Sequence, residues 1–259
     1  MIDLKIPNKK FDAQIAITET VAWLQKWFAE NGPDHKAVIG ISGGKDSTVT
    51  AMLCAKALGK DRVFGVLMPN GEQSDIDDAY AVCKALDIDH ITVDINPACR
   101  AIKHAIKPHL QDHWSKQTST NLPPRVRMTT LYAISQTING RVINTCNYSE
   151  DYVGYSTRYG DAAGDVSPLG KFTVHEVIEI GKILCKEFNL DSSLIVKTPS
   201  DGLCGKTDED NLGFTYVVLD NYIRNGIEPN AAIKAKIDNL HIKNEFKLKP
   251  IPTFDYFAA

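Results

Sequence analysis

The amino-acid sequence predicts an α/β fold, in which a doubly wound parallel sheet carries helices on both faces and is followed by a helical C-terminal region. Short apolar runs rich in β-branched residues alternate with segments of helical periodicity, which is the pattern of successive βαβ units. The first run ends in two adjacent glycines and passes directly into a helical segment. The length of 259 residues suits one domain, with a core sheet over about residues 36–190 and helices over about 207–259.

Four apolar segments are expected to be the strands, at residues 37–41, 63–68, 91–95 and 141–145. Apolar periodicity and capping residues predict helices over 11–31, 47–58, 74–86, 125–137 and 174–188, and a mostly helical segment over 208–245. A capping box from Thr173 to Glu176 marks the start of one of these helices. Because ligands of doubly wound sheets bind beyond the carboxyl ends of the strands, functional residues are expected just after positions 41, 68, 95 and 145.

The composition excludes several classes of protein. There are 29 Lys and Arg against 32 Asp and Glu, for a net charge of −3, so no excess of positive charge attracts nucleic acid or an anionic membrane. No apolar run approaches the ~20 residues needed to cross a bilayer. The first residues also lack the apolar core of a secretory signal. We therefore expect a cytoplasmic protein that binds neither nucleic acid nor membrane.

The cysteines are spread singly along the chain, without the paired spacing of a zinc or iron–sulfur site. Such a distribution favours buried thiols in a reducing compartment over disulfides or metal ligands. The residues concerned are Cys54, Cys83, Cys99, Cys146, Cys185 and Cys204.

A turn that binds phosphate is predicted directly after the first strand. Adjacent glycines permit positive φ and remove the Cβ atoms that would keep an anion away. Backbone amides then converge in front of a helix N-terminus, whose dipole is positive. Serines add hydroxyl donors, a lysine adds a charge, and an aspartate beside an anion calls for a bridging cation, for which Mg²⁺ on a polyphosphate is the natural candidate. The turn consists of Gly40, Ile41, Ser42, Gly43, Gly44, Lys45, Asp46 and Ser47.

Two familiar glycine motifs do not fit this turn. In a Walker A loop the first glycine lies farther from the Gly-Lys pair than Gly40 lies from Gly44, and Ser or Thr stands where this chain has Asp46. The GxGxxG spacing of a dinucleotide-binding loop is missing as well. An ordinary strand–turn–helix junction is the alternative, although it needs neither the aspartate nor both serines.

The turn resembles the SGGxDS pyrophosphate loop of the ATP-pyrophosphatase superfamily, whose fold is adenine nucleotide alpha-hydrolase-like, a Rossmann-like architecture. Four later segments, in the same order along the chain, are similar to the NAD⁺ synthetases of the NAD synthase family. They read MPNGEQSDIDDA from Met68, RVRM from Arg125, NTCNYSE from Asn144 and GYSTRYGDAAGD from Gly154. The resemblance extends over roughly residues 10–257, so it rests on the whole chain and not on one short motif.

The resemblance implies a ligase that uses ATP and ammonia to amidate deamido-NAD⁺ to NAD⁺. An acyl adenylate would be the intermediate, with pyrophosphate and AMP released. Activation is needed because a carboxylate does not react with amines near neutral pH. A glutaminase would need a further domain of some 200–300 residues, so free ammonia is the expected nitrogen donor unless a separate glutaminase chain docks. The family also implies a homodimer whose dinucleotide site spans the subunit boundary.

The same resemblance implies roles for individual residues. ATP would be bound by the turn at positions 40–47 together with Met68, Gln73, Thr145 and Ser200. Deamido-NAD⁺ would be bound by Arg125, Arg158, Asp165, Phe246 and Lys247. Catalysis would involve Lys45, Asp46, Asp161 and Lys171, with Asp161 placing the ammonia, and Mg²⁺ would be held by Asp46 and Glu150. A surface position is the alternative for each of these Arg and Lys residues, and a solvated loop is the alternative for Glu150.

Three positions depart from the family pattern. Val174 stands where the family has a lysine directed at the ATP phosphates, and Lys171 is the candidate replacement. Asn144 replaces the glycine of the family's Gly-Thr pair, and Phe246 replaces a common histidine. These departures leave two other functions open, an amide synthetase acting on a different carboxylate and a nucleotide-binding regulator without turnover. Sulfur insertion into tRNA is disfavoured, because no paired cysteines and no basic face are evident.

Overall fold

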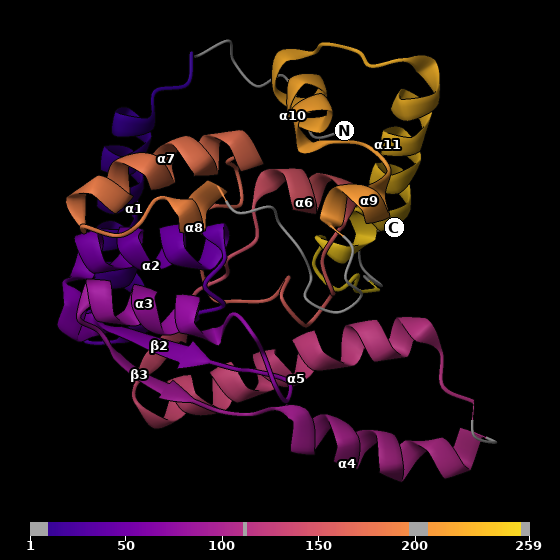
Figure 1. Cartoon of the computed structure of the whole chain (residues 1–259), viewed down its shortest axis with the longest axis horizontal. Helices are drawn as coiled ribbons and strands as arrows, with labels where there is room; N and C mark the ends of the chain where they lie inside the picture. Colours follow the sequence, from indigo (N-terminus) through magenta and orange to yellow (C-terminus); the bar gives the residue numbers. More distant parts are fainter. Residues whose placement is uncertain (1–9, 111–112, 197–206, 255–259) are drawn as a thin grey trace.

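The structure is a computed structural model, and it describes residues 10–110, 113–196 and 207–254. Four parallel strands form one sheet in the order β3-β2-β1-β4 (Figure 1), which confirms the predicted fold class. They are β1 (Lys36–Gly40), β2 (Val63–Leu67), β3 (Asp89–Thr92) and β4 (Gly140–Val142). The chain runs outward from β1 to β3 and then returns to the other side of β1. The direction of winding therefore reverses between β1 and β4, where a doubly wound sheet places its ligand.

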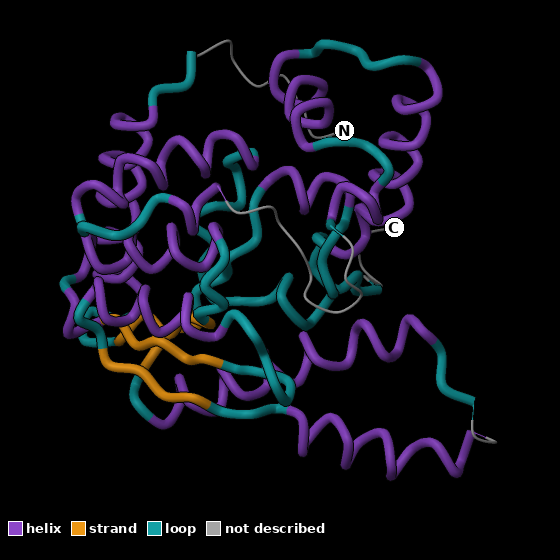
Figure 2. Tube along the Cα trace, in the orientation of Figure 1, coloured by secondary structure: helices purple, strands orange, loops and turns teal. Residues whose placement is uncertain are grey.

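One face of the sheet is covered by α1 (Ala13–Asn31), α2 (Lys45–Leu58), α3 (Ile76–Leu86) and α7 (Val174–Glu187) (Figure 2). Leu24, Met52 and Leu184 are fully buried in this layer. Helices α2 and α7 approach closely because Gly181 has no side chain. A Cβ atom at position 181 would lie 2.7 Å from Ile195 and 2.9 Å from Val49. The short helix α8 (Ser193–Val196) completes the contact.

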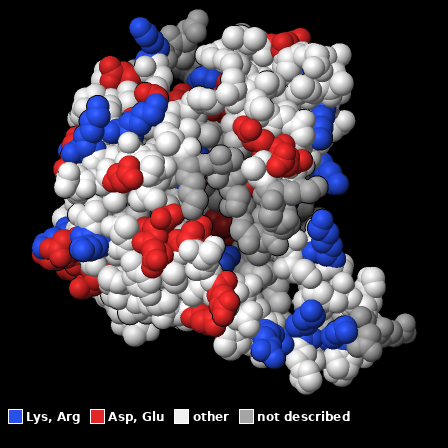
Figure 3. Space-filling view, in the orientation of Figure 1, with Lys and Arg blue, Asp and Glu red and all other residues white. Residues whose placement is uncertain are grey.

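The opposite face is covered by α4 (Asn96–Ile106) and α5 (Lys116–Thr137). A second apolar cluster, which includes Val66, Leu131 and Val142, fills this side. Beyond the sheet the two helices continue as an arm on which Lys and Arg side chains gather (Figures 1 and 3). The basic residues of its helices include Arg100, Lys103, Lys107 and Lys116.

The C-terminal helices form a third cluster around Val153, Leu219 and Ile237. They are α9 (Asp208–Leu212), α10 (Tyr216–Asn225) and α11 (Ala231–Asn244), and they pack on α6 (Tyr148–Val153). Three 3₁₀ turns accompany the helices, η1 (Lys60–Arg62), η2 (Lys107–Leu110) and η3 (Glu245–Lys247). The helical content predicted over 208–245 is confirmed.

Most predicted elements are present, and the differences have physical causes. Helix α5 begins at Lys116, well before the predicted residue 125, and continues through Pro123 and Pro124, which usually stop a helix because they lack an amide hydrogen. Helices α4, α6 and α8 were not predicted from the sequence. The third strand spans Asp89–Thr92 instead of residues 91–95, and the fourth spans Gly140–Val142 instead of residues 141–145.

The prediction that the cysteines are buried is confirmed for the described part of the chain. Cys54, Cys83, Cys99, Cys146 and Cys185 are all buried and free, while Cys204 lies outside the described residues. Burial raises the pKa of the Cys54 thiol to about 12. Among the helices that the structure describes, none combines the length and the apolar character that a membrane span requires.

We expect Ile39→Ala to lower the free energy of unfolding by about 2–5 kcal/mol, because Ile39 is 0% exposed at the centre of the sheet and its truncation leaves a cavity. Ile91→Ala is the matched control, since Ile91 is 39% exposed on the edge strand. It should cost about 1 kcal/mol or less. Urea unfolding followed by circular dichroism measures both, and equal losses would contradict the assigned core.

Candidate functional site

The turn after β1 has the geometry that phosphate binding requires. Gly43 has φ 81°, and a Cβ atom there would lie only 2.7 Å from the Asp78 side chain, so both conformation and space require glycine. Gly44 precedes α2 as its N-cap and supplies no side-chain cap. Ser42 and Ser47 hydrogen-bond to each other across the turn at 3.0 Å. The amides at the start of α2 therefore face a small polar concavity built by the turn itself.

This turn forms one wall of a cavity of about 1090 Å³ at the carboxyl ends of β1, β2 and β4. The cavity lies where the topology places a ligand for these three strands but not for β3, because no described residue between positions 76 and 115 lines it. The segment after β3 contacts the segment after β2 instead, because Asp94 accepts a hydrogen bond from the Gly71 amide at 2.9 Å. Of the sequence-predicted residues, the lining includes Gly40, Ile41, Ser42, Gly44, Lys45, Asp46, Ser47, Met68, Gln73, Thr145, Glu150, Asp161 and Lys247.

A buried charged cluster lies at the floor of the turn. The Lys45 ammonium is 2.7 Å from an Asp46 carboxylate oxygen and 3.7 Å from a Glu150 oxygen. Burial alone would lower the pKa of Lys45, but the two carboxylates outweigh it and raise that pKa above its ordinary value. Asn147 donates a hydrogen bond to the other Asp46 oxygen at 3.1 Å. The cluster thus joins the start of α2 to the segment that follows β4.

Glu150 lies in the first turn of α6 and not in a solvated loop or at the strand end. Asn147 caps this helix by accepting a hydrogen bond from the Glu150 amide at 3.1 Å. Burial, followed by the charge of Asp46, raises the pKa of Glu150 from 4.5 to about 8, although Lys45 opposes the shift. The Asp208 carboxylate adds to the negative charge. The cluster therefore holds more negative charge than one lysine neutralises.

This excess of charge fits a bound divalent cation. Asp46 and Glu150 offer oxygen donors, which Mg²⁺ prefers, and Mg²⁺ commonly takes only one or two protein carboxylates and completes its shell with phosphate and water. Among the described residues no group of three or more His, Cys, Asp or Glu is arranged to hold an ion. The donor set therefore suits a cation that arrives with a nucleotide rather than one held by protein alone.

The residues assigned to the second substrate are divided by the structure. Asp161 and Lys247 line the cavity, but Arg125, Arg158, Asp165 and Phe246 do not. The Arg158 guanidinium lies over the rings of Tyr159 and Phe246, at 5.0 and 5.4 Å. Asp165 accepts a hydrogen bond from the Val142 amide at 2.7 Å, so it supports β4. Binding roles for the four residues outside the cavity remain predictions.

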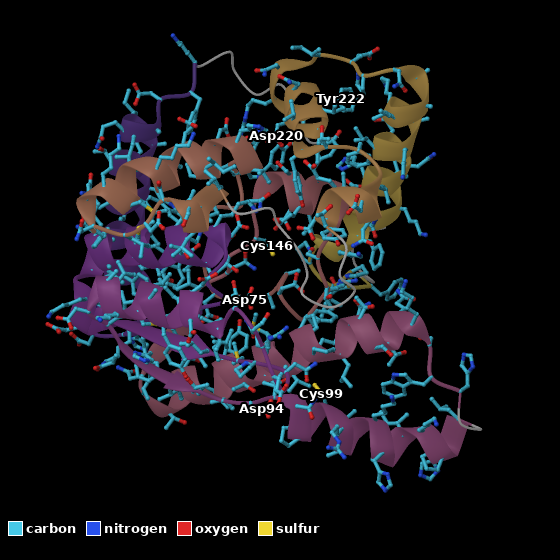
Figure 4. All side chains as sticks on the ribbon, in the orientation of Figure 1. Asp75, Asp94, Cys99, Cys146, Asp220 and Tyr222 are labelled. Carbon is cyan, nitrogen blue, oxygen red and sulfur yellow. The ribbon has the colours of Figure 1, made fainter. Side chains whose placement is uncertain are left out.

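Lys171 does not reach the cavity. Its ammonium lies 5.6 Å from the centre of the Tyr148 ring, outside the cavity wall. Val174 is buried in the C-terminal apolar cluster, and its amide donates to Ser149, which in turn donates to Asp220 of α10 (Figure 4). This geometry therefore does not support Lys171 as the substitute for the family lysine. The buried cation at the phosphate turn is Lys45. Ser200 lies outside the described residues.

Several residues of the cavity wall or of the charged cluster received no role from the sequence. Arg127 donates to the Met68 carbonyl at 3.0 Å and lines the cavity, and the RVRM segment was the available signal for it. Asn147 could have been found as a helix-capping asparagine two residues after Thr145. Asp208 is the first residue of α9 and lies between the capping-box residues Thr207 and Asp210, a signal that indicates helix geometry and not a site.

The family assignment follows from comparison with known proteins. The family model described as NAD synthase matches residues 16–251. The chain belongs to the NAD synthase family. It is 38% identical, over 83% of its length and 82% of the relative's, to the NH(3)-dependent NAD(+) synthetase of Thermococcus kodakarensis. The family expected from the turn and the later segments is thereby confirmed.

Two solved structures are similar over almost the whole chain. The structure of NMN synthetase from Francisella tularensis has a TM-score of 0.85 and 33% identity, and covers 95% of this chain and 100% of that one. The NH3-dependent NAD synthetase from Campylobacter jejuni, solved with a nitrate ion, has a TM-score of 0.73 and 28% identity over the same shares of both chains. The two similar structures are thus named for two different products.

We expect Glu150→Gln to stabilise the ligand-free protein as the pH rises. A carboxyl whose pKa is raised by folding from 4.5 to about 8 binds its proton more tightly in the folded state, so its contribution to stability is lost between those pH values. The loss is at most about 1.4 kcal/mol per pH unit. Urea unfolding should show a growing advantage of Glu150→Gln over the wild type between pH 5 and pH 8. A pH-independent difference would contradict the buried, proton-binding Glu150.

Proposed function

We propose that this protein is an ATP-dependent ligase that converts deamido-NAD⁺ to NAD⁺ with ammonia, through an acyl adenylate. The observation that carries the proposal is the meeting of the glycine turn and the buried Lys45–Asp46–Glu150 cluster in one cavity with Asp161 and Lys247, in a member of the NAD synthase family. The cavity offers a phosphate site and a second polar wall. A reaction that joins ATP to another substrate needs both.

In the first step an oxygen of the nicotinate carboxylate attacks the α-phosphorus of ATP, and the bond from that phosphorus to pyrophosphate breaks. Negative charge moves onto the leaving group, which amide donors of the turn and the Lys45 ammonium are placed to stabilise. Asp46 and Glu150 would hold Mg²⁺, which when bound neutralises charge on the pyrophosphate. Buried and oriented before the substrate arrives, these groups need little reorganisation during the reaction.

In the second step the nitrogen of ammonia attacks the acyl carbon, the bond from that carbon to AMP breaks, and a proton is lost. Asp161 is the carboxylate that we assign to placing the ammonia. It lines the cavity, and its side chain accepts a hydrogen bond from the Thr157 amide at 3.0 Å. Burial raises the pKa of Asp161, partly offset by hydrogen bonds and by the charge of Lys247. Lys247 donates to the Gly154 and Ser156 carbonyls at 2.8 and 3.2 Å, so it stiffens the same wall.

A second candidate function uses the same site on a smaller acid. The structural similarity to the NMN synthetase, with a TM-score of 0.85 against 0.73 for the Campylobacter jejuni NAD synthetase, favours it specifically. An enzyme of that kind would amidate nicotinate mononucleotide, which lacks the adenylate half of deamido-NAD⁺. Arg125 and Arg158, proposed to bind the dinucleotide, lie outside the cavity wall. The chemistry at the reacting carboxyl is the same for both substrates.

Assembly and nitrogen source belong to the same proposal. We propose a cytoplasmic homodimer that uses free ammonia. The exposed rings of Tyr159 and Phe246, each 55% exposed beside Arg158, are consistent with a dinucleotide site completed by a partner subunit. Lys247 already lines the cavity of its own chain, so its action does not require a partner.

The direct test incubates the protein with Mg·ATP and ammonium, and with either deamido-NAD⁺ or nicotinate mononucleotide. Chromatography then measures AMP together with NAD⁺ or nicotinamide mononucleotide. A larger kcat/KM for deamido-NAD⁺ supports the first candidate, and the reverse supports the second. Nucleotide binding without AMP from either acid would contradict both. Replacing ammonium by glutamine should abolish the reaction.

We expect Asp46→Asn to lower turnover by about 100-fold or more, because it removes a charge from both the ion pair with Lys45 and the proposed cation site. The amide still fits the space and Glu150 still faces the ammonium, so the protein should fold, but the urea midpoint should fall because the buried Lys45 loses one of its two charged partners. Asp61→Asn, on an exposed turn away from the cavity, is the matched control and should keep normal turnover. AMP release by Asp46→Asn at the normal rate would remove the assignment of Asp46.

A further inference from the structure

Asn144, which replaces a glycine of the family motif, has every hydrogen-bonding group of its side chain satisfied. It follows β4 and is buried. Its Nδ2 donates to the carbonyls of Asp161 and Ala163, at 2.7 and 2.8 Å. Its Oδ1 accepts from the Cys146 amide and the Ser167 hydroxyl, at 2.9 and 3.0 Å. A carboxamide has two N–H donors and two lone pairs on oxygen, so nothing is left unpaired.

Three of these four hydrogen bonds join two walls of the cavity that are separate in the sequence, and the fourth, from the Cys146 amide, lies within the turn of Asn144 itself. One wall is the turn after β4, where Thr145 and Cys146 line the cavity near the middle of the molecule (Figure 4). The other is the segment 161–167, in which Asp161 and Ala163 line the cavity. The backbone adds two hydrogen bonds between these segments, from the Asn144 amide to the Val166 carbonyl and from the Asp165 amide to the Val142 carbonyl, both at 2.8 Å. The Cys146 thiol also donates to the Asp161 carbonyl at 3.2 Å. The side chain of Asn144 therefore links the nucleotide side of the cavity to the Asp161 side.

The segment 161–167 passes so close to Asn144 that it needs a glycine. Gly164 has φ 153°, and a Cβ atom there would lie 2.8 Å from the Asn144 Cβ and 2.9 Å from its backbone nitrogen. Any other residue would push the segment away and lengthen the two hydrogen bonds of Nδ2. Asn144 and Gly164 are thus matched in shape, which is not expected of a surface asparagine.

We infer that Asn144 is a positioning residue that holds the main chain of Asp161, and through it the Asp161 carboxylate, at the point where ammonia meets the activated carboxyl. This inference rests on the proposed function, because it assumes that Asp161 places the ammonia. The phosphate turn and the Lys45–Asp46–Glu150 cluster make no hydrogen bond to the Asn144 side chain. Loss of the amide should therefore impair use of ammonia more than formation of the adenylate.

Two variants separate the inference from a general loss of folding. Asn144→Asp keeps the shape but removes both N–H donors and puts a carboxylate against two carbonyl oxygens. Asn144→Gly introduces the family residue and leaves no unpaired charge. It is the variant to measure if Asn144→Asp does not fold. Ser135→Ala is the matched control, because Ser135 is equally buried and hydrogen-bonded, to the Tyr132 carbonyl at 3.0 Å, but lies outside the cavity wall.

The two half-reactions are measured separately, using whichever acid the wild type accepts. Exchange of labelled pyrophosphate into ATP without ammonia reports adenylation, and steady-state turnover against ammonium concentration reports the second step. In both Asn144 variants we expect the apparent KM for ammonium to rise about tenfold or more, because small displacements of a positioning group are costly. The exchange rate should stay within about threefold of the wild type. Ser135→Ala should change neither quantity.

The outcomes are distinguishable from failure of the proposed function. A wild type that shows no exchange and no amide product with either acid overturns the proposed function itself. An active wild type, with an unchanged KM for ammonium in both variants, overturns the role of Asn144. An equal loss of exchange and of ammonium use also overturns it, because Asn144 would then support the whole site and not Asp161 in particular.

Discussion

The structure depends most on the burial of one ammonium among carboxylates. Lys45 stands at the start of α2 and Glu150 at the start of α6, and their charged groups are 3.7 Å apart with Asp46 beside them. A charge removed from water is stable only when it is paired and hydrogen-bonded. The phosphate turn and the segment after β4 must therefore keep a fixed distance, and the cavity between them keeps its shape.

The surrounding fold provides this fixed distance. Strands β1 and β4 are hydrogen-bonded neighbours, so the two segments that carry the cluster leave the sheet side by side at the switch point. Helices α1 and α7 pack against α2 and hold its start in place. The C-terminal helices pack on α6 in the same way. The carboxyl groups outnumber the lysine, and burial together with the charge of Asp46 raises the pKa of Glu150. Carboxyl groups crowded around one lysine repel each other when no ligand is bound. Such a site is suited to bind a cation and a polyphosphate together.

Hydrogen bonds of uncharged groups complete the site. Asn147 caps α6 and also donates to Asp46, while Asn144 joins the turn after β4 to the segment of Asp161. Each of these two side-chain amides holds two chain segments together. Charged groups alone would not fix the relative position of those segments. The second polar wall is thereby brought to the phosphate site without adding to its charge. Such an arrangement suits a reaction in which two substrates must meet at one carboxyl group.

The sequence by itself determined the features that are local in the chain. Alternating apolar runs indicated the parallel sheet, and the octet from Gly40 to Ser47 indicated the phosphate turn, because its glycines, serines and aspartate are contiguous. Tertiary structure alone decided which distant charges meet. In the structure Glu150 lies in a capped helix, Lys171 lies at the Tyr148 ring, and Asp165 supports β4. The physical reason is that burial and hydrogen bonding depend on neighbours from other elements, and their positions are set by packing and not by spacing along the chain.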